Sequence, residues 1–183
     1  MDAIELLLTR SSHAKLTEPA PTGDALETIL NAGVRAPDHA NLSPFRFVVC
    51  QNKGLDRLAD IFTQATIKSG MEQVKVDKAQ TMPYRAPMVI VAICEYKYHE
   101  KVPRVEQIAT TACAVQNMQM AAFALGFNGI WRTGYLASND YVRESFKLKQ
   151  DDEILGFLYV GTPMTPTPIK RQKDSNTVTQ MWD

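Results

Sequence analysis

The sequence predicts a domain that combines helices with a β-sheet, of the α/β or α+β class. Segments with strand composition alternate along the chain with segments of helical periodicity, and neither a linker nor an internal repeat separates them. Residues 87–94 form an almost unbroken apolar run, which is typical of a strand buried on both faces. A chain of 183 residues, 45% of them hydrophobic, can build one sizeable core but not two. We therefore expect one domain over residues 1–183. The sequence does not define the path of the chain over residues 164–183.

Each element follows from composition and spacing. Apolar residues at helical spacing predict helices over residues 3–8, 22–33, 55–67, 104–125 and 141–146, with Thr22 as the N-cap of the second. Aromatic and β-branched residues predict strands over residues 45–50, 87–94, 130–131 and 154–160. Pro37 and Pro44 confine residues 36–43 to a loop. The polar stretch 68–84 follows no such pattern, so we expect it to be the most mobile part of the chain.

The helix predicted over residues 104–125 is apolar nearly all round, which is typical of a helix buried on every side. It would be about 33 Å long, and a chain of this length has little material with which to surround it. Its small residues Ala109, Ala112, Cys113 and Ala114 would let a second helix approach closely. We therefore expect this helix at the interface of a homodimer, the alternative being the central helix of a monomer.

Composition argues against several classes of partner. The 20 basic and 20 acidic residues balance, and the densest basic run, 170–173, is short, so we expect no nucleic acid partner. No segment approaches the roughly 18 apolar residues of a membrane span, and the N-terminus lacks the basic start of a signal peptide. Cys50, Cys94 and Cys113 are widely spaced and odd in number, which favours buried free thiols over disulfides or a metal site. We expect a cytoplasmic protein without a membrane partner.

Familiar catalytic motifs are missing, since the chain has no GxGxxG, no phosphate loop, no HExxH and no GxSxG. Three polar groups in loops remain as candidates. The first, residues 10–15, sets the guanidinium of Arg10 beside the hydroxyls of Ser11 and Ser12, with Lys15 close behind. A cation and hydroxyl donors at this spacing suit a phosphate monoester, and the alternative is a solvated basic loop.

The second group, residues 35–45, is a loop stiffened by prolines that carries Arg35 and His39. Its alternative interpretation is a structural or merely exposed histidine. The third group, residues 126–134, places glycines around Trp131, Arg132 and Thr133. Glycines permit the close approach of a planar ligand, and the alternative is a plain turn and strand.

In order and spacing these groups resemble the nitroreductase family over about residues 1–163. The short first helix and the Arg-x-Ser motif at 10–12 match the start of the family, and the Ala-Pro loop at 36–37 leads to a turn and strand at 43–47. A long central helix followed by a Gly-x-Trp-x-Thr-Gly segment at 129–134 is a further match, as is a last strand ending Val-Gly-Thr-Pro at 160–163. Length and the Asp38-His39 pair resemble a short bacterial subfamily of NAD(P)H nitroreductases.

The resemblance implies an α+β fold with a central mixed or antiparallel sheet flanked by helices, and a long buried helix at the interface of a homodimer. It implies one FMN in each of two interface clefts, each built from both chains. Arg10, Ser12 and Arg35 would bind the phosphate and ribityl end, Ser11 would contribute its backbone, and His39 would lie beside the flavin. The other subunit would supply Trp131, Arg132 and Thr133. The implied contacts to NADH or NADPH are Ala121, Ala122, Phe123, Ala124, Leu125 and Gly126.

The implied activity is a ping-pong oxidoreductase reaction, in which NADH or NADPH gives hydride to flavin N5 and leaves. A nitroaromatic, quinone or similar small organic acceptor then takes its place and is reduced. The flavin carries the chemistry, so no residue of the protein is expected to act as a catalytic acid or base. Two alternatives stay open: another flavin reaction on the same scaffold, such as enone reduction or flavin fragmentation, and a non-catalytic flavin-binding protein.

The chain departs from the family pattern at several positions. Ser11 stands where a second arginine is frequent, and Lys15 is the nearest cation that could replace it. Ser43 and Phe45 replace the usual Gln and Trp, so we expect the substrate side of the flavin to differ. The tail after residue 163 matches no family pattern. Its Arg171 is a further cation that could reach a phosphate.

Overall fold

The computed structural model describes residues 2–167 and 174–182, and its centre is an antiparallel sheet. β3 (Met88–Cys94) pairs with β2 (Phe45–Cys50) on one side and with β5 (Glu153–Pro163) on the other. β4 (Asn128–Arg132) also pairs with β5. Because the middle of β5 pairs with both β3 and β4, β5 lies between them. The short β1 (Leu16–Thr17) pairs with the last residues of β5.

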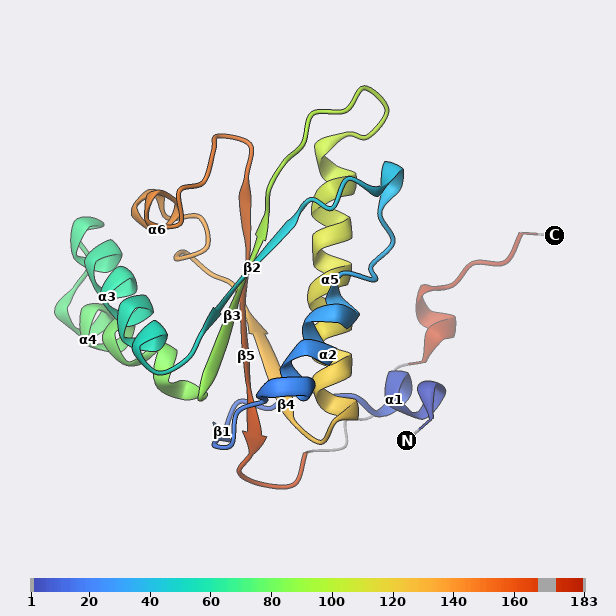
Figure 1. The fold of residues 1–183 in the computed structure, drawn as a ribbon, viewed down its shortest axis with the longest axis horizontal. Coiled ribbons are helices and arrows are strands. Elements are labelled where there is room, and N and C mark those ends of the chain that lie inside the picture. The colour runs from blue at the N-terminus through green and yellow to red at the C-terminus, as the bar shows by residue number, and fades with distance from the viewer. Residues whose placement is uncertain (1, 168–173, 183) are drawn as a thin grey trace.

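Helices cover both faces of the sheet, so that the fold has three layers with the sheet in the middle (Figure 1). One face carries α2 (Gly23–Gly33) and the long α5 (Arg104–Ala124). The other carries α3 (Lys53–Lys68), α4 (Gln73–Thr81) and α6 (Asp140–Ser145). The short α1 (Ala3–Thr9) lies beside the end of α5, and the C-terminal segment projects on the same side of the molecule (Figure 1). This arrangement confirms the predicted α+β fold, with the sheet antiparallel throughout the described strands.

β3 explains why the structure needs two helical layers. All seven of its residues are buried, as the apolar run predicted. Val89, Val91 and Ile93 belong to the core beneath α3 and α6, whereas Met88 and Ile90 belong to the core beneath α2 and α5. A strand places alternate side chains on opposite faces, so an unbroken apolar run requires cover on both sides.

The polar stretch 68–84, in which the sequence shows no pattern, contains α4 and a turn of 3-10 helix, η2 (Pro83–Arg85), while its mobility stays a prediction. α4 packs on α3 through Ala79, which is fully buried, and Met82 and Pro83 continue the contact with the core. So few apolar residues do not produce a helical pattern that can be recognised in the sequence.

α5 is not buried on every side within one chain, as expected for a helix that the chain has too little material to surround. Its exposed residues Val105, Ala109, Cys113 and Gln116 recur every three or four positions and form one stripe along the helix. Cys113 is therefore an exposed thiol, whereas Cys50 and Cys94 are buried as predicted.

Among the helices that the structure describes, none is both long enough and apolar enough to cross a membrane. The described side chains also form no cluster of histidine, cysteine and carboxylate groups that could hold a metal ion.

Candidate functional site

The first predicted group begins where α1 ends. Asp2 caps this helix, since its Oδ1 accepts the N–H groups of Ile4 and Glu5 at 2.8 and 2.9 Å. The helix ends at Thr9, and the N–H of Arg10, its C-cap, donates to the carbonyl of Leu6. Within the described part of the chain, the guanidinium of Arg10 makes no hydrogen bond or ion pair. Local capping thus places an uncommitted cation at a helix C-terminus, where the carbonyl ends of the helix favour positive charge.

The segment after Arg10 is fixed to α5 and β4 by one glutamine. Gln119 Nε2 donates to the Oγ of Ser12 at 3.3 Å and to the carbonyl of Gly129 at 2.9 Å. The N–H of His13 donates to the same carbonyl at 3.1 Å, and Ser11, between Arg10 and Ser12, is fully buried. Since the Ser12 hydroxyl accepts from Gln119, its own proton can be donated to a ligand. The structure therefore brings the first and third predicted groups together in one chain.

The third group is held by close packing of β4 on β5. Trp131 Nε1 donates to the carbonyl of Leu155 at 2.9 Å, beside Gly156. Gly156 has a φ of 136°, and a Cβ there would lie 2.5 Å from both the Arg132 carbonyl oxygen and Trp131 Nε1. Only glycine fits this position, because it avoids both the strained backbone and the clash. The backbone of residues 131–133 is thereby fixed.

Arg132 and Thr133 face different surroundings. The Arg132 Cζ lies 5.6 Å from the ring centroid of Tyr159, which belongs to the core beneath α3 rather than to the face that carries α5. Its Nε is buried without a hydrogen-bond partner among the described residues. Thr133 is exposed and lines a hollow of about 310 Å³ together with Ile108 of α5. On the side of the sheet that carries α5, a ligand could therefore contact Thr133 and the backbone of the third group, but not the Arg132 side chain.

The second group is attached to the first half of α5. α2 approaches α5 at Gly33, where a Cβ would lie 2.8 Å from Met118 Cγ. Farther along, Thr110 Oγ1 donates to the carbonyl of Pro37 at 3.0 Å. His39 Nδ1 lies 2.7 Å from Glu106 Oε2 in an ion pair whose two side chains are about half exposed. Arg35 is exposed in the segment between Gly33 and Pro37.

The loop that carries His39 has an unusual backbone. Ala40, Asn41 and Ser43 have φ values of 60°, 53° and 50°, a region that residues with a side chain rarely adopt. Asp38 Oδ2 accepts the Ser43 N–H at 2.6 Å, which holds this conformation. Phe45, which follows, stacks on Phe47 with ring centroids 5.5 Å apart. Ser43 and Phe45 thus have structural roles here, while the effect of these replacements on a ligand stays a prediction.

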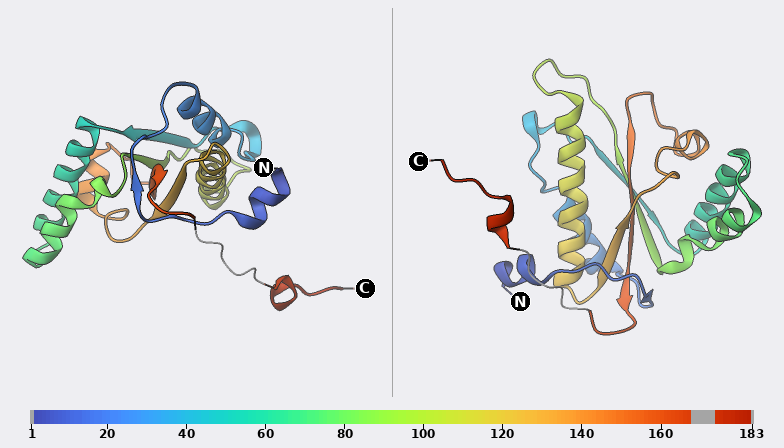
Figure 2. Two further views of the ribbon diagram at one scale, coloured as in Figure 1. Left: turned by 90° about the horizontal axis from the view of Figure 1, so that it is seen from below. Right: turned by 180° about the vertical axis from the view of Figure 1, so that it is seen from behind.

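α5 separates the attachment points of the groups. A helix advances about 100° per residue, so Glu106 and Thr110 lie on one side of α5, and Ile108 and Gln119 lie on the other. The exposed stripe of residues 105, 109, 113 and 116 runs between the two sides. Figure 2 shows α5 from behind, with the loop of η1 (His39–Asn41) on one side and β4 on the other. Glu106 and Gln119 are about 20 Å apart along the axis, so one chain does not bring His39 to Ser12.

Residues 121–126, expected to contact NAD(P)H, form the C-terminal end of α5. Ala122 is fully buried, Ala121 and Phe123 are half-buried, and Ala124, Leu125 and Gly126 are exposed. Of these residues, only Ala122 could not touch a ligand without rearrangement. Carbonyl oxygens end this helix, so the site would suit the sugar or base of a nucleotide better than its phosphates.

Sequence reasoning missed the side chains that position these groups, namely Glu106, Thr110 and Gln119. A recognisable signal was present, because polar residues on a helix expected to be buried require hydrogen-bond partners. Gln107 shows the same behaviour, since its side chain bonds to the N–H and carbonyl of Lys97. Asp38 was named only as part of a motif, although it fixes the loop.

Comparison with known proteins identifies the family. The sequence model of the Nitroreductase family matches residues 7–162, most of the chain and all three groups. The chain belongs to the nitroreductase family. The Escherichia coli (strain K12) protein with the provisional name NAD(P)H nitroreductase YdjA is 47% identical to this nitroreductase over 163 residues, or 89% of each chain.

Solved structures show the same nitroreductase fold. A nitroreductase-like family protein from Bacillus cereus superposes with a TM-score of 0.86 at 21% identity, covering 100% of this chain and 97% of that one. A nitroreductase from Desulfovibrio desulfuricans, solved in complex with FMN, has a TM-score of 0.74 at 21% identity and covers 100% and 99%.

Proposed function

We propose that this nitroreductase-family chain is an FMN-dependent NAD(P)H oxidoreductase that reduces nitroaromatics, quinones or similar small acceptors as a homodimer. The relative named an NAD(P)H nitroreductase and the structural neighbour solved with FMN support this assignment. The observation that carries it is the arrangement around Gln119, which sets Ser12 and β4 side by side next to the uncommitted Arg10.

The residues present fit the phosphate end of FMN. Arg10 supplies a guanidinium without a partner in the described chain, and Ser12 supplies a hydroxyl proton. Lys15 is exposed a few residues later and adds positive charge near the same segment. A phosphate monoester is bound by such a combination of charge-assisted and hydroxyl hydrogen bonds. Arg35, which is exposed shortly after α2, is the further cation that we assign to the phosphate and ribityl end.

The exposed stripe of α5 supports a cleft shared between two chains. Its residues Ala109 and Cys113 are small, and Val105 is an exposed apolar side chain, so the stripe can pack closely on an equivalent helix. A two-fold axis through an antiparallel helix pair would place the first turn of one α5 beside the last turns of the other. His39 of one subunit would then approach Ser12 and Thr133 of the other. This proposed division keeps His39 and residues 131–133 on opposite chains, but it places Arg10 and Ser12 with residues 131–133 instead of with His39.

When bound, FMN supplies a two-electron carrier that takes hydride from NADH or NADPH and passes it to the acceptor. The protein's task is to bind the cofactor, to orient it and to exclude water. Thr133 and the fixed backbone of β4 would line one wall, and His39, held by Glu106, would line the opposite wall. The exposed end of α5, residues 124–126, stays the proposed contact for part of the nucleotide.

The test is the absorption spectrum of the purified protein, followed by anaerobic addition of NADH or NADPH. We expect a yellow protein that is bleached by the nucleotide and recovers its colour on addition of a nitroaromatic or quinone. A yellow protein that neither nucleotide bleaches would point to flavin binding without this activity. A colourless protein that takes up no added FMN would overturn the proposal.

A further inference from the structure

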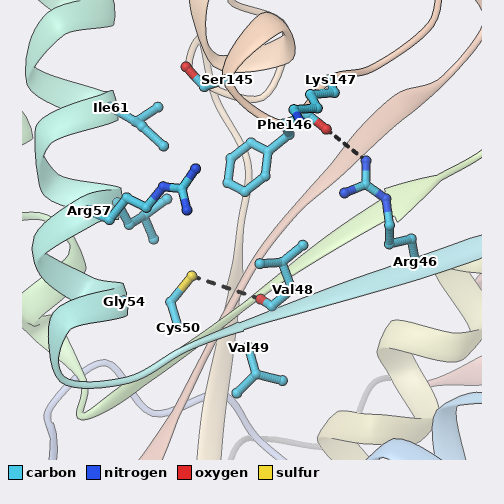
Figure 3. A pocket seen from close by; sticks show the side chains of 11 residues that line it. Arg46, Val48, Val49, Cys50, Gly54, Arg57, Ile61, Ser145, Phe146 and Lys147 are labelled. Carbon is cyan, nitrogen blue, oxygen red and sulfur yellow. Dashed lines mark hydrogen bonds between the residues drawn. The ribbon is translucent and has the colours of Figure 1, made fainter.

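A cavity of about 350 Å³ lies on the face of the sheet that carries α3 and α6, away from α5 (Figure 3). The edge strand β2, the first half of α3 and the segment after α6 enclose it. Its apolar walls are formed by Val48, Leu58, Ile61 and Phe146. Cys50, the last residue of β2, also lines it. This size is within the range of pockets that hold small organic molecules.

The charged residues that line this cavity are all cations: Arg46, Arg57 and Lys147. Arg46 is already committed, because it donates to Glu95 at 2.5 Å and to the Phe146 carbonyl at 2.9 Å. Arg57 makes no hydrogen bond or ion pair with any residue that the structure describes. Figure 3 shows its guanidinium extending from α3 into the space below Ile61 and beside the Phe146 ring.

The cysteine does not neutralise this charge. Burial raises the pKa of the Cys50 thiol to about 11, although the charge of Arg57 lowers it. The thiol is therefore uncharged at neutral pH and acts as part of the apolar wall. The cavity combines an apolar interior with an unpaired guanidinium and no neutralising anion among its lining residues.

We propose that this cavity binds a small aromatic carboxylate, with its ring against Phe146, Val48 and Ile61 and its carboxylate on Arg57. Arg57 is exposed, so water can hydrate its guanidinium, and a carboxylate could replace that water with paired, charge-assisted hydrogen bonds. An aromatic body matches the apolar walls and the ring of Phe146. Inorganic anions would leave the walls unused, and a neutral ring would leave the guanidinium unpaired. The site is separate from the proposed flavin cleft, because the sheet lies between them.

Gly54 provides a matched pair of variants. A Cβ at this residue would meet only Cys50 Cβ, at 3.6 Å, an ordinary contact, and the backbone of α3 is not strained there. Gly54→Ala should therefore leave binding unchanged, whereas Gly54→Leu should extend into the cavity and block it. Arg57→Gln removes the charge, Arg57→Lys keeps it, and Lys53→Gln removes an exposed cation of the same helix that does not line the cavity.

The experiment is a titration of the full-length protein, isotope-labelled at isoleucine methyl groups, with 2-naphthoate, followed by NMR. We expect a saturable shift of the Ile61 methyl signal, weakened at least about tenfold by Arg57→Gln and abolished by Gly54→Leu. Gly54→Ala, Lys53→Gln and, to a lesser extent, Arg57→Lys should preserve it. The neutral analogue 2-naphthol should bind at least about tenfold more weakly.

Three results would overturn the proposal: no saturable shift up to about 10 mM ligand, equal binding by Arg57→Gln, or equal binding of 2-naphthol. Saturable shifts confined to Ile108, which lines the hollow beside Thr133, would also overturn it by placing the ligand on the α5 side. Because the wild-type protein and the neutral analogue are compared first, the outcome does not depend on the folding of any variant.

Discussion

Gln119 donates through one side-chain nitrogen to Ser12 Oγ at 3.3 Å and to the Gly129 carbonyl at 2.9 Å. An amide nitrogen carries two protons, so both contacts can be made at once. The residue is 5% exposed, which means that solvent cannot replace either contact. One buried side chain thus sets the position of the proposed phosphate-binding segment relative to β4.

Replacing Gln119 with Leu should weaken FMN binding while leaving the chain folded. The change leaves the Gly129 carbonyl with one donor fewer and releases Ser12, a cost of about 1–2 kcal/mol, or roughly five- to thirtyfold in affinity. Fluorescence titration of the apoprotein measures this directly. Gln64→Leu, at an exposed position of α3, is the control and should bind FMN as the wild type does.

Arg10→Ala should reduce FMN affinity by about 1.5–3 kcal/mol, or roughly ten- to a hundredfold, through the loss of a charge-assisted contact. Riboflavin lacks the phosphate, so its affinity should be nearly the same for wild type and variant. Arg10→Lys should recover part of the loss. An unchanged FMN affinity in Arg10→Ala would place the phosphate elsewhere.

Ala109→Glu should dissociate the proposed homodimer. Ala109 is exposed in the single chain, so the substitution does not disturb the core, but in a dimer it would bury an unpaired carboxylate at a cost of several kcal/mol. Sedimentation at micromolar concentration should show a dimer for the wild type and a monomer for the variant. Gln64→Glu adds the same charge on α3 and should stay dimeric. A stable wild-type monomer would refute the assembly.

Arg10→Ala and His39→Ala subunits should complement each other if each cleft takes Arg10 from one chain and His39 from the other. Every cleft of either variant homodimer then carries one lesion, whereas a mixed dimer has one intact cleft. Mixing equal amounts after reversible dissociation should restore about a quarter of wild-type activity. Each variant must first lower turnover at least about tenfold, or about 1.4 kcal/mol in barrier. No recovery would mean that both residues serve the cleft of their own chain.

Tyr159 should make the protein less stable in strong alkali. Burial raises the pKa of its hydroxyl from 10.0 to about 12, although Arg132 and Arg85 lower it. The folded state thus holds a proton that the unfolded state releases, so the stabilisation is complete below about pH 10 and is lost as the pH rises toward 12. Two pKa units correspond to about 2–3 kcal/mol. Urea unfolding of wild type and Tyr159→Phe at about pH 8 and 11 should show a smaller loss of stability for the variant.

The sequence predicted the layered fold well where patterns were strong. The apolar run of β3 and the helical spacing of α2, α3 and α5 were recognisable because each buries a wide apolar surface. α4 was missed because Ala79 is its one fully buried residue, and β1 because two residues show no periodicity. The side of α5 that its own chain leaves exposed was not predicted, since composition does not show which residues of an apolar helix form that stripe.

The site was predicted by its residue types but not by its geometry. Nothing in the sequence spacing indicates that Ser12 lies beside Gly129 while His39 lies about 20 Å away along α5. The direction of the Arg132 side chain was equally hidden, because it depends on which face of β4 the residue occupies and therefore on register.

Within one chain, three segments of the proposed site are attached to the same helix. Glu106, Thr110 and Gln119 of α5 hold His39, Pro37 and Ser12, respectively. Unwinding this helix would therefore release the segments of His39, Pro37 and Ser12 together instead of loosening them one at a time. On heating, we expect flavin fluorescence to appear at the temperature at which helical circular dichroism is lost, as one cooperative transition. The cofactor would then report on the integrity of the whole molecule, and excess FMN would raise the midpoint of both signals equally.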